Sequence, residues 1–99
     1  MLGYKVMRLS EDSKKFISGA NSRLEFEAKC GEISMPGNGI YMSTNKQYVL
    51  DYYSGLADRE ALITFEFNEK EITFGNIEDV QNEVAVNKAK IVNIEELEE

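Results

Sequence analysis

The chain has 99 residues, 42% hydrophobic and 29% charged, which is the composition of a single soluble globular domain spanning residues 1–99. Its 18 Asp and Glu against 11 Lys and Arg give a formal net charge of −7, and without a cluster of basic residues we expect no direct nucleic-acid binding. With no His and one Cys it offers no metal site and no internal disulfide, and without a membrane-spanning or signal-peptide run we expect a cytoplasmic protein with no membrane contacts.

The first third of the chain is predicted to place a short helix between two strands. Residues 4–9 alternate in a strand that carries Arg8 near its end. The polar stretch that follows is expected to open a short helix over residues 14–17. Residues 23–30 alternate strictly, which predicts a half-buried strand, and residues 32–36 are expected to form a loop.

Residues 37–45 are the most distinctive stretch, because a glycine turn there delivers a short strand and then a helix. Asn38-Gly39 adopts the positive φ angles of a tight turn at little steric cost. In the strand over residues 40–43 side chains alternate, so Tyr41 and Ser43 point to the same face. The pattern either sets a tyrosine and a serine side by side at a functional edge or is an ordinary hairpin arm that feeds a helix.

The helix after this strand is predicted to run from Thr44 to Leu56. Thr44 is the expected N-cap, and Gln47 three residues later completes a capping box. The apolar face of this helix is expected to combine side chains at helical spacing, namely Tyr48, Val49, Tyr52, Tyr53 and Leu56.

The second half of the chain is predicted to be mainly strands. Residues 61–67 are the most hydrophobic of them and place Phe65 in the core. A shorter extended piece over residues 70–74 and two last strands over residues 80–86 and 90–94 follow, and the Glu-rich final five residues are expected to fray. Strands interleaved with two short helices indicate a compact α+β domain.

Two sets of residues resemble motifs of the ADP-ribosyltransferase superfamily. The strand Gly37-x-Gly39-Ile40-Tyr41, the second tyrosine Tyr52 eleven residues later and a late strand opening with Asn82-Glu83 are similar to the poly-ADP-ribose polymerase-like branch. Arg8, Ser43-Thr44 and Gln81-Asn82-Glu83 stand in the order of the three motifs of the bacterial-toxin branch. The resemblance spans most of the chain and implies a compact, reduced ADP-ribosyltransferase-like sheet domain.

This resemblance implies a mono-ADP-ribosyltransferase that uses NAD as a substrate and modifies a side chain of a protein target. Glu83 would be the catalytic residue, because a carboxylate hydrogen-bonded to the ribose stabilises the positive charge that develops on the sugar. Gln81, two residues earlier and on the same strand face, would orient the acceptor. Glu83 has the alternative explanation of a solvated carboxylate at the start of a strand.

Four further side chains are expected to bind NAD by the same resemblance. Tyr41 and Tyr52 would stack on the nicotinamide ring, and Ser43 would form a hydrogen bond in the pocket wall. Arg8 would meet the NAD phosphates, which favour a guanidinium. The two tyrosines are equally explained as core residues, and Arg8 as a partner in a surface ion pair.

Departures from the family pattern support a second hypothesis. The chain has no histidine, and Ser43-Thr44 is followed by Asn45 rather than a second serine. The alternative is therefore a catalytically inactive, acidic ADP-ribosyltransferase-like protein that binds and inhibits a partner by offering carboxylates to a basic groove. A phage-encoded inhibitor of a nucleic-acid-binding defence complex, such as an anti-CRISPR, would be an example.

Overall fold

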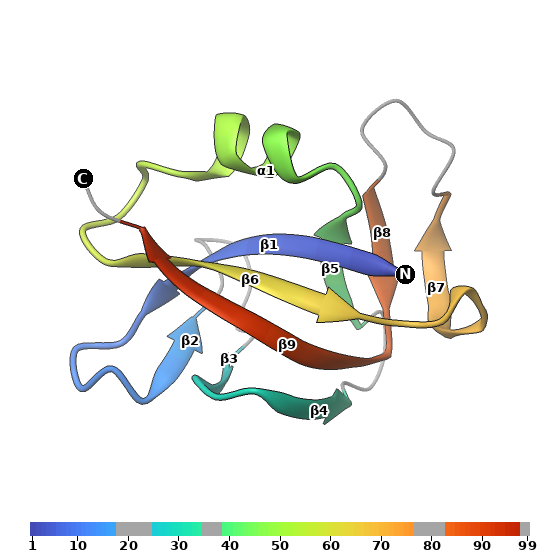
Figure 1. Ribbon diagram of the computed structural model, residues 1–99, viewed down its shortest axis with the longest axis horizontal. Coiled ribbons are helices and arrows are strands. Elements are labelled where there is room, and N and C mark those ends of the chain that lie inside the picture. Colours follow the sequence, from blue (N-terminus) through green and yellow to red (C-terminus); the bar gives the residue numbers. More distant parts are fainter. Residues whose placement is uncertain (18–24, 35–38, 77–82, 98–99) are drawn as a thin grey trace.

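The structure, a computed structural model, describes residues 1–17, 25–34, 39–76 and 83–97. These residues form an antiparallel sheet in the order β4-β9-β6-β1-β5-β8-β7, and off this path β2 pairs with both β1 and β3 (Figure 1). The strands are β1 (Leu2–Leu9), β2 (Lys15–Ile17), β3 (Glu25–Glu27), β4 (Gly31–Ser34), β5 (Ile40–Ser43), β6 (Glu60–Glu66), β7 (Ile72–Gly75), β8 (Glu83–Val86) and β9 (Lys88–Leu97).

Helix α1 (Lys46–Tyr53) lies along one face of the sheet, where it contacts β1 and β5 (Figure 1). A short 3-10 helix, η1 (Glu69–Glu71), joins β6 to β7. The described part of the chain is thus mostly antiparallel β-sheet with a single α-helix. The predicted α+β class with two short helices is wrong.

The helix predicted over residues 14–17 is in fact strand β2. The Asp12 carboxylate accepts hydrogen bonds from Ser10 Oγ at 2.6 Å and from the backbone N–H of Lys14 at 3.0 Å. The polar residues therefore close a turn between β1 and β2 instead of capping a helix. Strand geometry also buries Phe16 completely, whereas a single exposed helical turn would bury no such side chain.

Three further expectations for the strands are corrected. The strand expected over residues 23–30 is present only as β3, since residues 28–30 are not in a strand and residues 23 and 24 lie outside the described part of the chain. The loop expected over residues 32–36 begins inside β4, whose Glu32 lies opposite Lys90 of β9. The Glu-rich end of the chain does not fray as far as Leu97, because β9 pairs with β6 until Leu97 lies opposite Glu60. An acidic sequence is compatible with a strand that has one exposed face.

Three predicted strands, over residues 4–9, 40–43 and 61–67, are confirmed by β1, β5 and β6. The predicted strand over residues 80–86 is confirmed from Glu83 onward, and its first three residues lie outside the described part of the chain. The order of these strands in the sheet is set by pairings between distant segments, such as β1 with β6.

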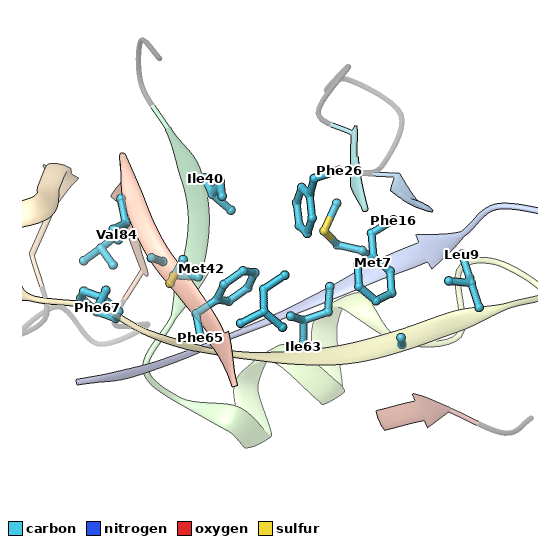
Figure 2. Packing of buried hydrophobic residues seen from close by; sticks show 14 residues of the cluster. Met7, Leu9, Phe16, Phe26, Ile40, Met42, Ile63, Phe65, Phe67 and Val84 are labelled. Atoms are coloured by element: carbon cyan, nitrogen blue, oxygen red, sulfur yellow. The ribbon is translucent and has the colours of Figure 1, made fainter. Parts of the chain in front are cut away.

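The hydrophobic core lies on the face of the sheet away from α1 (Figure 2). Phe26 of β3 meets Phe16 and Phe65 edge to face, with ring centroids 5.8 Å and 6.4 Å apart. The alternating residues of β6 expected on this face are all buried. The buried cluster consists of Met7, Leu9, Phe16, Phe26, Ile40, Met42, Ala61, Ile63, Phe65, Phe67, Val84, Val86, Ala89 and Ile91.

Helix α1 begins and ends one to three residues inside its predicted limits. Asn45, not Thr44, is the N-cap, because its side-chain oxygen accepts a hydrogen bond from the N–H of Tyr48 at 3.0 Å. Beyond the last helical residue, the Glu60 carboxylate accepts hydrogen bonds from the N–H groups of Gly55 and Leu56. These contacts end the helix at Tyr53.

The apolar face expected for this helix is only partly buried. Val49 is buried against the sheet, but Tyr52 and Leu56 are 67% and 75% exposed. The prediction of one continuous apolar face is therefore wrong. The helix ends at Tyr53, so Leu56 lies beyond it, and Tyr52 packs on Tyr48 at the surface instead of on the sheet.

We predict that Phe65→Ala lowers the free energy of unfolding by about 3–5 kcal/mol, because it leaves a cavity in the middle of the core. Phe65 is fully buried. The matched control is Phe74→Ala, which removes the same ring from a side chain that is 66% exposed. Urea unfolding of both variants checks the prediction, and equal midpoints for the two would contradict it.

We also predict that Asn45→Ala lowers the free energy of unfolding by about 1 kcal/mol, because the N–H of Tyr48 loses its acceptor. Thr44→Ala serves as the control, since Asn45 and not Thr44 holds the cap position. The comparison is made in urea. If Thr44→Ala is the more damaging of the two substitutions, the assignment of the cap is wrong.

Candidate functional site

Strand pairing brings together three of the residues singled out from the sequence. In the β5–β8 ladder Glu83 lies opposite Ser43, and Ala85 lies opposite Tyr41. Residues opposite one another in an antiparallel pair share a face, and so do residues two apart on one strand. Glu83, Ser43 and Tyr41 therefore lie on the same face, and this is the face that α1 contacts, because Ile40 and Met42 point into the core.

Glycines at both neighbours of β8 explain why this strand fits between β5 and β7. Gly39, just before β5, has φ of +81°, and a Cβ there would lie 2.2 Å from the carbonyl oxygen of Val86. Gly75, at the end of β7, has φ of +88°, and its Cβ would lie 2.5 Å from the carbonyl oxygen of Glu83. Both positions therefore require glycine. Gly37, the other glycine of the sequence motif, lies outside the described residues.

The Glu83 carboxylate is half-buried and has one specific partner on α1. Its Oε1 accepts a hydrogen bond from the hydroxyl of Tyr53 at 3.0 Å. Partial burial raises the pKa of Tyr53 strongly, and hydrogen bonding to Tyr48 and Glu83 raises it further. The phenol consequently stays protonated and acts as a donor to Glu83.

The tyrosine that reaches Glu83 is therefore Tyr53 and not Tyr52. Tyr52 packs on Tyr48 along the outside of the helix, with ring centroids 4.8 Å apart, and its side chain is more exposed than that of Tyr53. The signal for Tyr53 was present in the sequence, because it lies four residues after the buried Val49 and so on the same helix face.

A second aromatic contact, between Tyr41 and Phe74, was not expected from the sequence. Tyr41 of β5 and Phe74 of β7 both lie opposite Ala85 of β8, so they flank a small residue on the same face. Their rings meet edge to face with centroids 6.3 Å apart, and they are 46% and 66% exposed. This aromatic pair lies about 7 Å along β8 from Glu83. Tyr41 is thus not a core residue.

Ser43 is buried, and its Oγ accepts a hydrogen bond from the N–H of Asn45 at 3.0 Å. The serine thereby links the end of β5 to the N-cap of α1. Its expected hydrogen bond to NAD remains a prediction, as does the stacking of Tyr52 on nicotinamide.

No described contact brings Arg8 next to Glu83. Tyr4 of β1 lies opposite Ser43, and Arg8 lies four residues further along the same face of β1. That separation is about 13 Å along a strand, which an extended dinucleotide is long enough to bridge. The contact of Arg8 with phosphates therefore stays a prediction, and Gln81 lies outside the described residues.

Lys5 is half-buried on β1, and burial lowers its pKa while the negative charge of Glu83 acts in the opposite direction. In the register of β1 with β6, Lys5 lies opposite Ile63 and therefore on the strand face that carries the core. Among the described residues no ion pair joins Lys5 to Glu83.

A cavity of about 350 Å³ lies at the opposite end of β8, next to the start of β9. Its walls carry the ammonium groups of three lysines and the carboxylates of three glutamates, and the N-terminal ammonium of Met1, which donates a hydrogen bond to the carbonyl oxygen of Phe67, also lines it. The charged side chains are Lys70, Lys88, Lys90, Glu32, Glu66 and Glu71. Positive and negative groups are thus mixed in this cavity, and none of its lining residues is one of the predicted site residues.

No protein-family model matches the chain, and no curated protein and no solved structure is significantly similar to it. Within the described segments, no group of three or more His, Cys, Asp or Glu is placed to hold a metal ion. In the same segments no helix is long and apolar enough to cross a membrane. Function is therefore inferred from the residues of this chain and their geometry.

We predict that Gly39→Ala destabilises the protein more than Gly55→Ala. Both glycines have positive φ, which costs about 1–2 kcal/mol with a side chain. Only at Gly39 would the new Cβ also collide with the backbone of β8, since nothing lies within 4 Å of a Cβ at Gly55. Urea unfolding measures the difference, and equal losses would show that β8 does not pack as closely on Gly39 as described.

Proposed function

We propose that this protein is a mono-ADP-ribosyltransferase that transfers ADP-ribose from NAD to a side chain of a protein target. The observation that supports the proposal is the position of Glu83 directly opposite Ser43, with Tyr41 on the same face. These residues come from motifs about 40 positions apart in the sequence. The proposal rests on this juxtaposition together with the resemblance of the motifs, and not on the fold class.

The reaction breaks the bond between the nicotinamide nitrogen and C1′ of the ribose, and the electron pair leaves with nicotinamide. Positive charge then develops on the sugar, as in glycoside cleavage. The nucleophilic atom of the acceptor forms a new bond to C1′ and gives up its proton. The Glu83 carboxylate, accepting a hydrogen bond from a ribose hydroxyl, stabilises this charge more strongly in the transition state than in the ground state.

The other residues have binding roles in this proposal. The exposed ring of Tyr41 offers a flat surface to nicotinamide, and the exposed Tyr52 offers a second one from α1. Arg8 binds the phosphates from further along β1, and Gln81 orients the acceptor. These binding roles follow from the family resemblance.

The alternative of an inactive acidic binding protein is supported by a different observation. Tyr41 and Phe74 present an exposed aromatic pair on a chain whose formal net charge is −7. Exposed aromatic side chains are enriched in protein interfaces, and excess carboxylates attract a basic partner. In this alternative Glu83 contributes charge to a surface and has no catalytic role.

We predict that Glu83→Gln reduces the rate of ADP-ribose transfer by about 10²–10³-fold, because the amide keeps the shape but lacks the charge that faces the developing cation. The assay incubates the protein with labelled NAD and a cell lysate and measures label on protein. Glu69→Gln is the matched control, since it makes the same change at an exposed residue of η1. Melting temperatures of both variants establish that they are folded.

Two outcomes would contradict the transferase proposal. One is a wild-type protein that neither labels any protein nor releases nicotinamide from NAD. The other is a folded Glu83→Gln variant with wild-type activity. If instead charge reversals on the acidic surface abolish capture of a basic partner while Glu83→Gln does not, the binding alternative is supported.

A further inference from the structure

We propose that Tyr53 is a positioning residue, which holds the Glu83 carboxylate in a single orientation through the hydrogen bond from its hydroxyl to Oε1. The inference rests on the proposed function and names a residue that the family motifs did not indicate. The contact joins the last residue of α1 to the first residue of β8, two elements with no backbone pairing between them. It fixes a side chain that strand pairing alone leaves free to rotate.

The hydrogen bond from Tyr53 gives the two carboxylate oxygens of Glu83 different roles. Oε1 accepts the bond from Tyr53 at 3.0 Å, and this leaves Oε2 to accept a bond from a ribose hydroxyl. A carboxylate held in this way is already oriented when the substrate binds, so no further ordering is needed in the transition state. Rotation of Glu83 away from the sheet would break the bond to Tyr53.

Tyr53 is itself held in place from two sides. Tyr48, five residues earlier on α1, meets its ring edge to face with centroids 6.0 Å apart. The helix is fixed to the sheet by the buried side chain of Val49 and at its start by the Asn45 cap. The donor therefore sits on a regular element supported by packing, which is the arrangement that best maintains a catalytic geometry.

The protonated phenol of Tyr53 suits a donor role. Partial burial and hydrogen bonding to Tyr48 and Glu83 raise its pKa, so the hydroxyl keeps its proton near neutral pH. A protonated hydroxyl can donate to the Glu83 carboxylate, which is the direction of the contact in the structure.

The test compares Tyr53→Phe with Tyr4→Phe, which removes the same hydroxyl from a half-buried tyrosine of β1 that forms no described hydrogen bond with Glu83. Hydrolysis of NAD, with water as the acceptor, releases nicotinamide and measures the reaction without any need for a protein acceptor. We expect Tyr53→Phe to lower kcat by about 10–100-fold with little change in KM for NAD, as for loss of a group that orients a reacting one. Tyr4→Phe should retain the wild-type kcat.

A second measurement tests the contact independently of activity. Absorbance titration of the tyrosines should show one phenol that ionises at lower pH in Glu83→Gln than in the wild type. Burial and Tyr48 still raise its pKa in the variant, but the contribution of the Glu83 carboxylate is lost. The same phenol should be missing from the titration of Tyr53→Phe.

The outcomes separate this inference from the proposed function. If Glu83→Gln loses activity but Tyr53→Phe keeps the wild-type kcat, the positioning role is overturned and the transferase proposal stands. If Glu83→Gln keeps full activity, the transferase proposal fails, and the positioning role fails with it. An unchanged tyrosine titration in Glu83→Gln overturns the Tyr53–Glu83 contact itself.

Discussion

Strand β8 is paired on both sides, with β5 and with β7, and its residues Val84, Ala85 and Val86 are fully buried. A four-residue strand in this position has little freedom to shift, because a slip by one residue would turn Val84 and Val86 out of the core and Glu83 into it. The same register puts Glu83 opposite Ser43. The location of the candidate site is thus set by the packing of apolar residues on the other face of the sheet.

The two faces of the sheet consequently have different roles. The face with Phe65, Ile63 and Met7 carries the buried cluster and most of the apolar burial (Figure 2). The α1 face near β8 carries a carboxylate, a phenol and exposed aromatic rings. Because successive side chains of one strand serve opposite faces, substitutions at Glu83 or Tyr53 change chemistry with little effect on the core. Such a separation makes the kinetic comparison of folded variants feasible.

Period-two alternation predicted the strands over residues 4–9 and 61–67, but the equally strict alternation over residues 23–30 gives a strand only at Glu25–Glu27 among the described residues. Residues 61–67 alternate over a full strand, whereas three residues around Phe16 fit a helical turn and a strand equally well. The polar residues before Phe16 are compatible with either a cap or a turn, and only burial of Phe16 against Phe26 selects the strand. The acidic end of β9 pairs with β6, which is distant in the sequence, so a local pattern predicts a frayed tail there instead of a strand.

At the candidate site too, the sequence predicts what alternation along one strand determines, but not what depends on packing between elements. Tyr41 and Ser43 share a face by simple alternation, and that much followed from the sequence. The choice of Tyr53 over Tyr52 depends on which face of α1 packs on the sheet, since one residue changes direction by about 100° around a helix, and the buried Val49 sets that face. Phe74 could not be assigned at all, because its approach to Tyr41 requires both neighbours of β8 to be known.

The pairing of β1 with β6, and of β6 with β9, joins the beginning, middle and end of the described chain (Figure 1). Sheets built from such distant pairings fold slowly, because the entropy of closing long loops is lost before the pairs form. During synthesis on the ribosome, β1 emerges well before β6 and cannot bury Met7 and Leu9 until that strand is available. We therefore expect the nascent chain to depend on protection of this early apolar strand, and to acquire its sheet only after β6 and β9 have both emerged from the ribosome.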